Sequence, residues 1–218
     1  MAPACAGARR LTTIDPNLVH TWLAARSLAR GLPAPVAESG GWRVDTDSET
    51  ELRRYVFAQA GDGLIRLART IDRPRIFLKL CADADTLLSL LPAGWTITDA
   101  NCMMTNTAQP PPLALPTGYA LHTDRRDAVT HVTITTDEGA SAASGYAAEQ
   151  AGAFVYDRII VEDAHRRRGL GSALMAALGA ARRDPASQQV LTATDMGAAL
   201  YASLGWRLYA PYTTAARA

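Results

Sequence analysis

The sequence predicts an α/β protein of the α+β kind, with a mixed, mainly antiparallel sheet flanked by helices. Two observations indicate this fold class. In the C-terminal half, short β-type segments follow one another with turn residues between them, as in an antiparallel meander. A succession of helix, strand, helix and strand then follows, which is typical of helices packed on a sheet.

The N-terminal half begins with a helix. Asp15 and Pro16 form an N-cap and first helical position, and Gly31 marks the end. Beyond an extended connector, the pattern predicts strands at 42–45, 54–59, 75–80 and 95–104, and helices at 62–71 and 83–91. Residues 1–13 are expected to be loose.

In the second half, the pattern predicts strands at 119–123, 129–136, 141–150, 154–161, 190–194 and 206–213, with helices from about 170 to 183 and at 197–204. A proline-rich segment, 109–116, reads as a stiff linker between a domain at 1–108 and a second at 117–218.

The composition excludes several classes of protein. The 218 residues are 48% hydrophobic, which is ordinary for a globular chain, and a net charge of +1 favours neither nucleic acid nor a membrane surface as partner. No apolar run approaches a transmembrane length and no secretory signal is evident. Three scattered cysteines give no metal spacing or disulfide framework, so we expect a reducing, cytoplasmic setting and no metal.

One stretch, residues 161–175, carries the strongest functional signal. An apolar run ends at Val161, three arginines follow at 166–168, and Gly169-Leu170-Gly171 precedes an apolar helical stripe. A helix N-terminus offers unpaired backbone N–H groups, glycines allow a ligand to approach them, and arginines add positive charge. This order predicts an anion site, most plausibly for a diphosphate.

Two common diphosphate motifs do not fit. No Gly-Lys-Ser/Thr follows the loop, so it is not a Walker A motif. A dinucleotide fingerprint would need a small residue where Leu174 stands, and the glycines come too late after the strand for a tight turn.

Instead, Arg166-x-x-Gly169-x-Gly171 resembles the acyl-CoA-binding motif of the GCN5-related N-acetyltransferases (GNATs), whose loop binds the coenzyme A pyrophosphate through backbone amides. Residues 200–206, with Tyr201 and Trp206, resemble the family's Leu-Tyr-x-x-x-Gly-Phe/Trp segment. The resemblance covers roughly residues 117–215. Thr194 stands where the family often has asparagine, so no contact is assigned to it. The resemblance implies an acetyl-CoA site at Ile159, Val161, Arg166, Arg167, Arg168, Gly169, Leu170, Gly171 and Ser172.

The same resemblance gives Tyr201 the role of protonating the departing thiolate. Transfer from a tyrosine of pKa ~10 to a thiolate whose acid has pKa ~8.5 is uphill by ~2 kcal/mol. The sequence does not single out a general base. Asp157 shares a strand face with Val155 and Ile159, and Glu149 ends the neighbouring strand, so either is a candidate. The alternative for each is an ordinary salt-bridged carboxylate.

The two halves resemble each other. Leu91-Pro-Ala-Gly-Trp95 is similar to Ser203-Leu-Gly-Trp206, and Gly61-Asp-Gly63 to Gly169-Leu-Gly171, which indicates an internal duplication. The first copy is expected to be a degenerate GNAT-like or accessory half without a coenzyme A site, because it lacks the arginines and Asp62 would repel phosphate.

The sequence therefore predicts an acyl-CoA-dependent N-acetyltransferase that moves an acetyl group to a small-molecule or peptide amine. The alternative is a non-catalytic coenzyme A-binding or protein-interaction module of the same fold. A homodimer remains open, and nothing in the sequence identifies the acceptor.

Overall fold

A computed structural model describes residues 13–108 and 114–217. Most of the segment expected to be loose, and Pro110, Pro111 and Pro112 of the expected linker, lie outside these residues. The first half contains α1 (Pro16–Ala29), β1 (Val36–Glu38), β2 (Gly41–Asp45), β3 (Arg53–Phe57), α2 (Asp62–Thr70), β4 (Ile76–Leu80), α3 (Ala84–Leu90) and β5 (Trp95–Asn106).

The second half contains β6 (Tyr119–Arg126), β7 (Val129–Thr136), β8 (Ser141–Gln150), β9 (Ala153–Val161), a short 3-10 turn η1 (Asp163–His165), α4 (Leu170–Gly179), β10 (Gln188–Ala193), α5 (Asp195–Ser203) and β11 (Arg207–Arg217). The predicted helices and strands are all present, with ends shifted by a few residues. The sequence analysis missed β1, which begins at the last residue of the expected connector, Val36.

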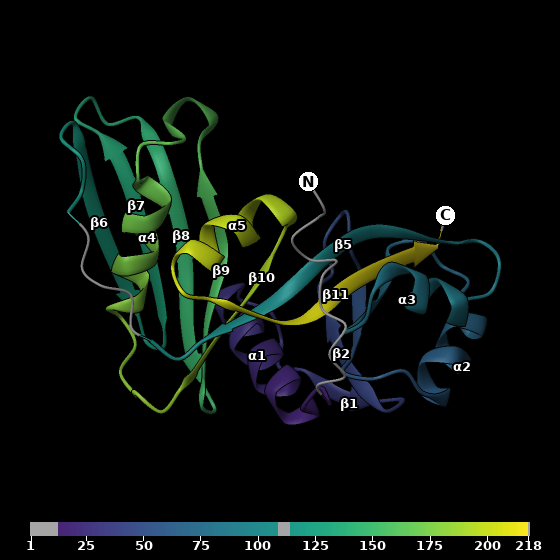
Figure 1. The fold of residues 1–218 in the computed structure, drawn as a ribbon. Helices are drawn as coiled ribbons and strands as arrows, with labels where there is room; N and C mark the ends of the chain where they lie inside the picture. The colour runs from purple at the N-terminus through teal and green to yellow at the C-terminus, as the bar shows by residue number, and fades with distance from the viewer. Residues whose placement is uncertain (1–12, 109–113, 218) are drawn as a thin grey trace.

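All the described strands join one sheet, in the order β1-β2-β3-β4-β11-β5-β10-β9-β8-β7-β6. Two strand pairs are parallel, β3 with β4 and β9 with β10, and the others are antiparallel. Figure 1 shows the long strands β5 and β11 running side by side between two lobes. The mixed, mainly antiparallel sheet flanked by helices confirms the predicted fold class.

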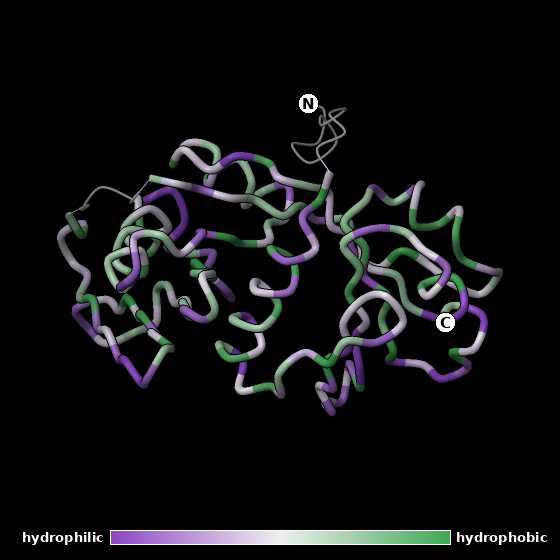
Figure 2. The backbone as a smooth tube through the Cα atoms, turned by 90° about the horizontal axis from the view of Figure 1, so that it is seen from below, coloured by the Kyte–Doolittle hydropathy of each residue, from purple (hydrophilic) through white to green (hydrophobic). Residues whose placement is uncertain are grey.

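The helices divide between the two faces of the sheet. One core cluster joins α4 and α5 to the C-terminal strands, and another joins α2 and α3 to the N-terminal strands. A third cluster packs α1 on the opposite face, where Trp22 meets Val155, Val190 and Tyr212. The backbone view in Figure 2 shows hydrophobic segments passing between the lobes, with hydrophilic residues at many outer turns.

The strand order is symmetric about β5 and β11, with the parallel pair β3–β4 on one side and β10–β9 at the corresponding place on the other. The last strand of each half lies inside the other: β11 pairs with β4 of the first half, and β5 pairs with β10 of the second. Each long strand also carries one unpaired residue, Thr98 on β5 and Tyr209 on β11, three residues after Trp95 and Trp206 respectively. This matching irregularity supports the expected internal duplication.

Because each half contributes a strand to the other, the cores on both sides of β5 and β11 depend on both halves. The division into domains at 1–108 and 117–218 stays a prediction. Within the described residues, no helix has the length and apolar character needed to span a lipid bilayer.

Candidate functional site

The parallel pair β9–β10 opens towards its C-terminal end. The two strands pair from Ala153↔Gln188 to Tyr156↔Leu191 only, although β9 continues to Val161. Beyond Tyr156, β9 keeps its partner β8 but has no paired residue on the β10 side among the described residues. The backbone groups on this side of β9 are therefore available to a ligand, as strand-edge N–H and C=O groups are.

A β-bulge lies where the strands separate. Asp157 pairs with Tyr146 and Ile160 with Ser144, so Arg158 and Ile159 together oppose Gly145. Arg158 has a positive φ of 53°. A Cβ on Gly145 would stand 2.6 Å from the end of the Ile159 side chain, so a larger residue here would displace Ile159. Bulges of this kind are common beside active sites, because they redirect side chains and end regular pairing.

Helix α4 begins at the same end of β9 with an open N-terminus. Its N-cap is Gly169, at φ 81°, and no side chain caps it. By contrast, α1, α3 and α5 are capped by the side chains of Asp15, Asp83 and Thr194. The first N–H groups of α4 are thus left for another acceptor, and the helix dipole favours an anion there.

The three arginines before α4 have different partners. Arg166 pairs with Asp163 (2.7 Å) and donates to the Val161 carbonyl (3.4 Å), while Arg168 donates to the Tyr119 hydroxyl (3.2 Å). Arg167 is exposed, with a φ of 62°, and bonds to no side chain of the described residues. The loop is therefore tied down at both ends and presents positive charge at the start of α4.

Helix α5 packs directly behind this loop. A Cβ on Gly171 would lie 3.0 Å from Leu200 and 3.7 Å from Val161, so glycine allows α4, α5 and β9 to approach one another. Thr194 Oγ1 accepts from the Gly197 N–H and caps α5 (3.2 Å). This capping role explains a polar residue at position 194 without a ligand.

Tyr201 lies on α5 and is 7% exposed. Its ring packs at a tilt against Trp206, and within the described chain no group hydrogen-bonds its hydroxyl. Burial raises the pKa of Tyr201 to about 12. The hydroxyl is therefore protonated throughout the physiological range and is free to donate to a ligand.

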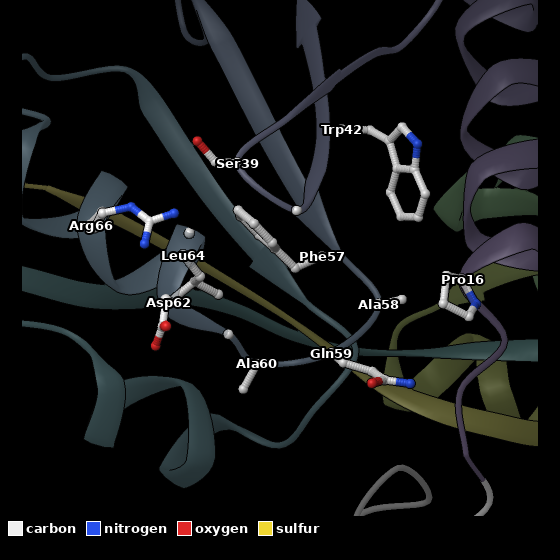
Figure 3. Close-up of a pocket in the computed structure, with 13 residues that line it drawn as sticks. Pro16, Ser39, Trp42, Phe57, Ala58, Gln59, Ala60, Asp62, Leu64 and Arg66 are labelled. Carbon is white, nitrogen blue, oxygen red and sulfur yellow. The ribbon is translucent and has the colours of Figure 1, made fainter.

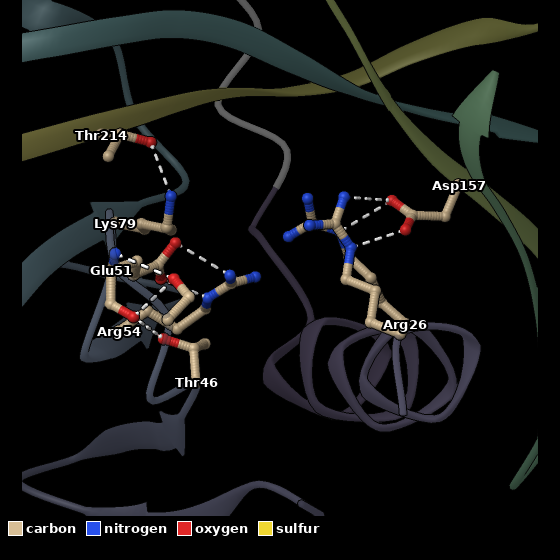
Figure 4. Close-up of polar contacts among 9 residues, drawn as sticks. Arg26, Thr46, Glu51, Arg54, Lys79, Asp157 and Thr214 are labelled. Carbon is tan, nitrogen blue, oxygen red and sulfur yellow. Dashed lines mark hydrogen bonds and ion pairs between the residues drawn. The ribbon is translucent and has the colours of Figure 1, made fainter. Parts of the chain in front are cut away.

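Asp157 lies at the point where β9 and β10 separate, but its carboxylate is already bound. It is 5% exposed and accepts from Arg26 Nε (3.2 Å) on α1, as Figure 4 shows, and from Nε (2.6 Å) and Nη2 (2.9 Å) of Arg30, the C-cap residue of α1. Burial alone would raise the pKa of Asp157, but Arg26 and Arg30 outweigh it and hold this pKa below its usual value. A carboxylate so strongly stabilised is a weak proton acceptor.

Glu149 is on β8 and pairs with Phe154 near the start of β9, where β9 and β10 are still paired. Its carboxylate accepts from the backbone N–H groups of Arg183 (2.9 Å) and Asp184 (3.0 Å), just beyond α4. Burial raises the pKa of Glu149, yet these bonds outweigh it and lower the pKa overall. The structure thus places Ile159, Val161 and Tyr201 in or against one core cluster beside the arginine loop. Asp157 lies on the α1 face of β9, and Glu149 lies apart from both.

The N-terminal half has a corresponding place at the start of α2, but there the strands stay closed. β3 and β4 pair along their whole lengths, from Arg53↔Ile76 to Phe57↔Leu80. A cavity of about 380 Å³ lies beside Gly61 and Asp62 (Figure 3). A Cβ on Gly63 would stand 1.6 Å from the Ser39 carbonyl oxygen, so the β1–β2 turn already covers this helix start. Asp62 adds a negative charge in the first turn.

Sequence reasoning missed the contribution of α1. Arg26 and Arg30 follow Trp22 at four-residue spacing, and this spacing is the signal that places all three on one helix face. It also missed two apolar side chains beside the opening, Ile160 on β9 (50% exposed) and Met196 on α5 (74% exposed).

The comparisons agree with this geometry. Residues 128–208 match the family model described as "Acetyltransferase (GNAT) domain". No curated protein matches the sequence.

Solved structures resemble nearly the whole chain. A GCN5-related N-acetyltransferase from Kribbella flavida has a TM-score of 0.62 and 18% identity, over 89% of this chain and 95% of its own. A putative acetyltransferase of the GNAT family from Novosphingobium aromaticivorans has a TM-score of 0.59 and 16% identity, over 94% of this chain and 99% of its own. A functionally unknown conserved protein from Staphylococcus epidermidis has a TM-score of 0.61 and 9% identity, over 84% of this chain and 93% of its own.

At these identities the likeness concerns the fold, and it extends over both halves of the sheet. The family match lies on the strands, loop and helices that build the opening between β9 and β10. Residues 128–208 therefore match an acetyltransferase (GNAT) domain, and the chain has the fold of the GCN5-related N-acetyltransferases.

Proposed function

We propose that this protein is an N-acetyltransferase that binds acetyl-CoA at the C-terminal half and transfers the acetyl group to an amine. One observation carries the proposal: the opened pair β9–β10 and the uncapped, arginine-flanked start of α4 occur together. The N-terminal half has an uncapped helix start as well, but its strands stay paired and Asp62 places a negative charge in the first turn of α2. Each chain is therefore expected to bind one acetyl-CoA.

The residues fit the parts of acetyl-CoA. The amides of Leu170, Gly171 and Ser172, with the charges of Arg166 and Arg167, suit the pyrophosphate. The free backbone edge of Ile159 and Val161 suits the amide-bearing pantetheine arm, which can pair with it as an added strand would. Ile160 and Met196 are exposed apolar side chains that a bound arm would cover.

In the reaction, the amine nitrogen attacks the thioester carbon, the new C–N bond forms and the C–S bond breaks. The proton lost by the amine leaves to solvent, and the thiolate gains one. Because the pKa of Tyr201 is about 12, full proton transfer to a thiolate whose acid has pKa ~8.5 is uphill by about 5 kcal/mol. Tyr201 therefore stabilises the departing sulfur by donating a hydrogen bond, while water supplies the proton.

No dedicated base is assigned. Asp157 and Glu149 are each held in the ionised form by several donors, which lowers their affinity for a proton. Their contacts support structural roles, with Asp157 fixing α1 over the sheet and Glu149 fixing the end of α4. The amine is expected to react from the fraction that is neutral in solution, so turnover rises with pH.

The test is release of free thiol from acetyl-CoA in the presence of amines, comparing wild type with Tyr201→Phe and Arg166→Glu. Wild-type turnover that both variants reduce supports the proposal. Tight acetyl-CoA binding without thiol release from any amine would instead identify a non-catalytic coenzyme A-binding module.

A further inference from the structure

Three buried hydrogen-bond donors on the α1 side of the sheet have no partner. They are Trp22 Nε1, Arg26 Nη1 and the Tyr212 hydroxyl. Tyr212 is 3% exposed, and Trp22 is fully buried. Buried polar groups in native proteins almost always have partners, so three orphans in one place require an explanation.

The three side chains are neighbours. The Trp22 ring meets Tyr212 edge-on, with centroids 5.3 Å apart, and Arg26 lies over the Trp22 ring at 5.3 Å. Arg26 and Tyr212 are close enough for each to affect the pKa of the other. The orphan donors of α1 and β11 therefore surround a common region.

This region adjoins the opening between β9 and β10. Trp22 belongs to the same core cluster as Val155 and Val190, which face each other one residue before the parallel pairing ends. One turn further along α1, Arg26 binds Asp157 through Nε and leaves Nη1 unpartnered. The orphan donors are thus beside the place where the β9 and β10 backbones separate.

The charge around these donors is not balanced. Figure 4 shows Arg26 and Asp157 on one side, and Glu51, Arg54 and Lys79 on the other. Arg54 is 5% exposed and binds Glu51 through two hydrogen bonds (2.5 and 2.9 Å). On the Asp157 side, three arginines share one carboxylate: Arg26 (3.2 Å), Arg30 (2.6 Å) and Arg158 (3.5 Å). Burial lowers the pKa of Lys79 to about 7, and the nearby arginines add to this.

We propose that the orphan donors of Arg26 and Tyr212 bind a carboxylate of the acetyl acceptor, and that the acceptor is an amine of the amino-acid type. A carboxylate accepts from several donors at once, and charge-assisted bonds from an arginine are the strongest of these. It would satisfy Nη1 of Arg26 and the Tyr212 hydroxyl and offset the surplus of positive charge. This inference rests on the proposed function and names the acceptor of the same site.

The competing explanation is that an ordered water satisfies the same donors. The two explanations differ in what Tyr212→Phe does. If the hydroxyl serves a ligand, its removal leaves the stability of the free protein unchanged or higher, because an unsatisfied buried group is lost. If a water completes a structural network, its removal lowers the melting temperature.

Tyr156→Phe is the matched control. The Tyr156 hydroxyl donates to Gln189 (2.6 Å) on the other face of the sheet. Its loss should lower the melting temperature without affecting selection of the acceptor. Tyr212→Phe, by contrast, should leave the melting temperature unchanged or higher and should alter selection of the acceptor.

The acceptors are the common L-amino acids, each paired with its own amide, assayed by thiol release from acetyl-CoA. We expect at least one amino acid to be used about tenfold more efficiently than its amide, and Tyr212→Phe to remove most of this preference by raising KM. Equal use of acids and amides by the wild type, or a preference that survives Tyr212→Phe, would overturn the proposal.

A second readout separates this inference from the proposed function. The same acids and amides are added without acetyl-CoA, and the melting temperature is measured, since a ligand of the folded state raises it. A shift with acids that Tyr212→Phe abolishes supports the carboxylate site even where no thiol is released. No shift and no acid-dependent turnover would reject it.

Discussion

Replacing Asp157 with asparagine separates a structural role from a catalytic one. The Asp157 carboxylate takes three hydrogen bonds from Arg26 and Arg30, and Arg158 Nε lies 3.5 Å away. Asparagine has a similar shape but no charge, and its NH₂ group would face a guanidinium. Arg26, with 14% of its side chain exposed, would then lose its anion and keep its charge.

The expected cost is about 3 kcal/mol of unfolding free energy. Removing one partner of a buried ion pair costs about 3–5 kcal/mol, because the other charge remains buried. The lower end applies, since Arg30 is 27% exposed and retains some contact with water. The matched control is Asp124→Asn, whose pair with Arg126 is largely exposed and is expected to change stability by less than about 0.5 kcal/mol.

The assay is urea unfolding of both variants and the wild type between pH 3 and 8. Because the pKa of Asp157 is lowered in the folded protein, its stabilising effect is complete above the unfolded pKa of ~3.9 and is lost as the pH falls through the folded pKa. The difference between wild type and Asp157→Asn should therefore be constant above pH ~5 and shrink below pH ~4. A stability loss under about 1 kcal/mol, together with loss of turnover, would refute this reasoning and restore Asp157 as a base.

Four further outcomes are expected. Tyr201→Phe should lower kcat about 10²-fold, with acetyl-CoA affinity little changed by titration calorimetry. With the pKa of Tyr201 near 12, the pH–rate profile of the wild type should show no fall due to this residue up to pH 10; a fall that Tyr201→Phe removes would contradict the burial argument. Gly63→Ala should cost at least about 2 kcal/mol of unfolding free energy in urea, because its Cβ would stand 1.6 Å from the Ser39 carbonyl oxygen. Gly61→Ala has open space around its Cβ and should cost far less. Equal costs for the two variants would count against the close packing at Gly63. Glu149→Gln should cost about 1–2 kcal/mol and leave kcat unchanged, and a pH-dependent loss of kcat would return Glu149 to the reaction.

Much of the fold could be predicted from local pattern. Pro16 after Asp15 marks the start of α1, and the N-cap bond from Asn17 to Asp15 (2.9 Å) is the expected one. The turn residues on either side of β8 gave the bounds of β7 and β8 to the residue. β1 was missed because three exposed or half-exposed residues carry no periodic signal.

The exchange of β5 and β11 could not be predicted, since it depends on long-range pairing. Trp95 and Trp206 indicated that the halves correspond, but nothing in the sequence indicates that the strand after each would pair inside the other half. The same limit applies to Asp157. It lies on the expected strand and on the side of Val155, but the bulge at Arg158 and Ile159 turns Ile159 to the other face. Its ion pairs with Arg26 and Arg30 come from residues more than a hundred positions earlier.

The arginine–glycine loop was easier to interpret, because its chemistry is contiguous in the sequence. Gly169 is needed for its positive φ, and Gly171 for the close approach of Leu200. In the sequence, both appear as the Gly-x-Gly spacing directly after the three arginines. Its openness to a ligand depends on the separation of β9 and β10, which only the structure reveals.

Calorimetric titration of acetyl-CoA tests the central claim most directly. The wild type should bind one molecule per chain, and Arg166→Glu combined with Gly171→Asp should bind none, while remaining folded by circular dichroism. Arg73→Glu, an exposed arginine remote from the loop, is the control for charge alone and should bind as the wild type does. Binding that survives the double variant, or no binding by the folded wild type, would contradict an acetyl-CoA site at the start of α4.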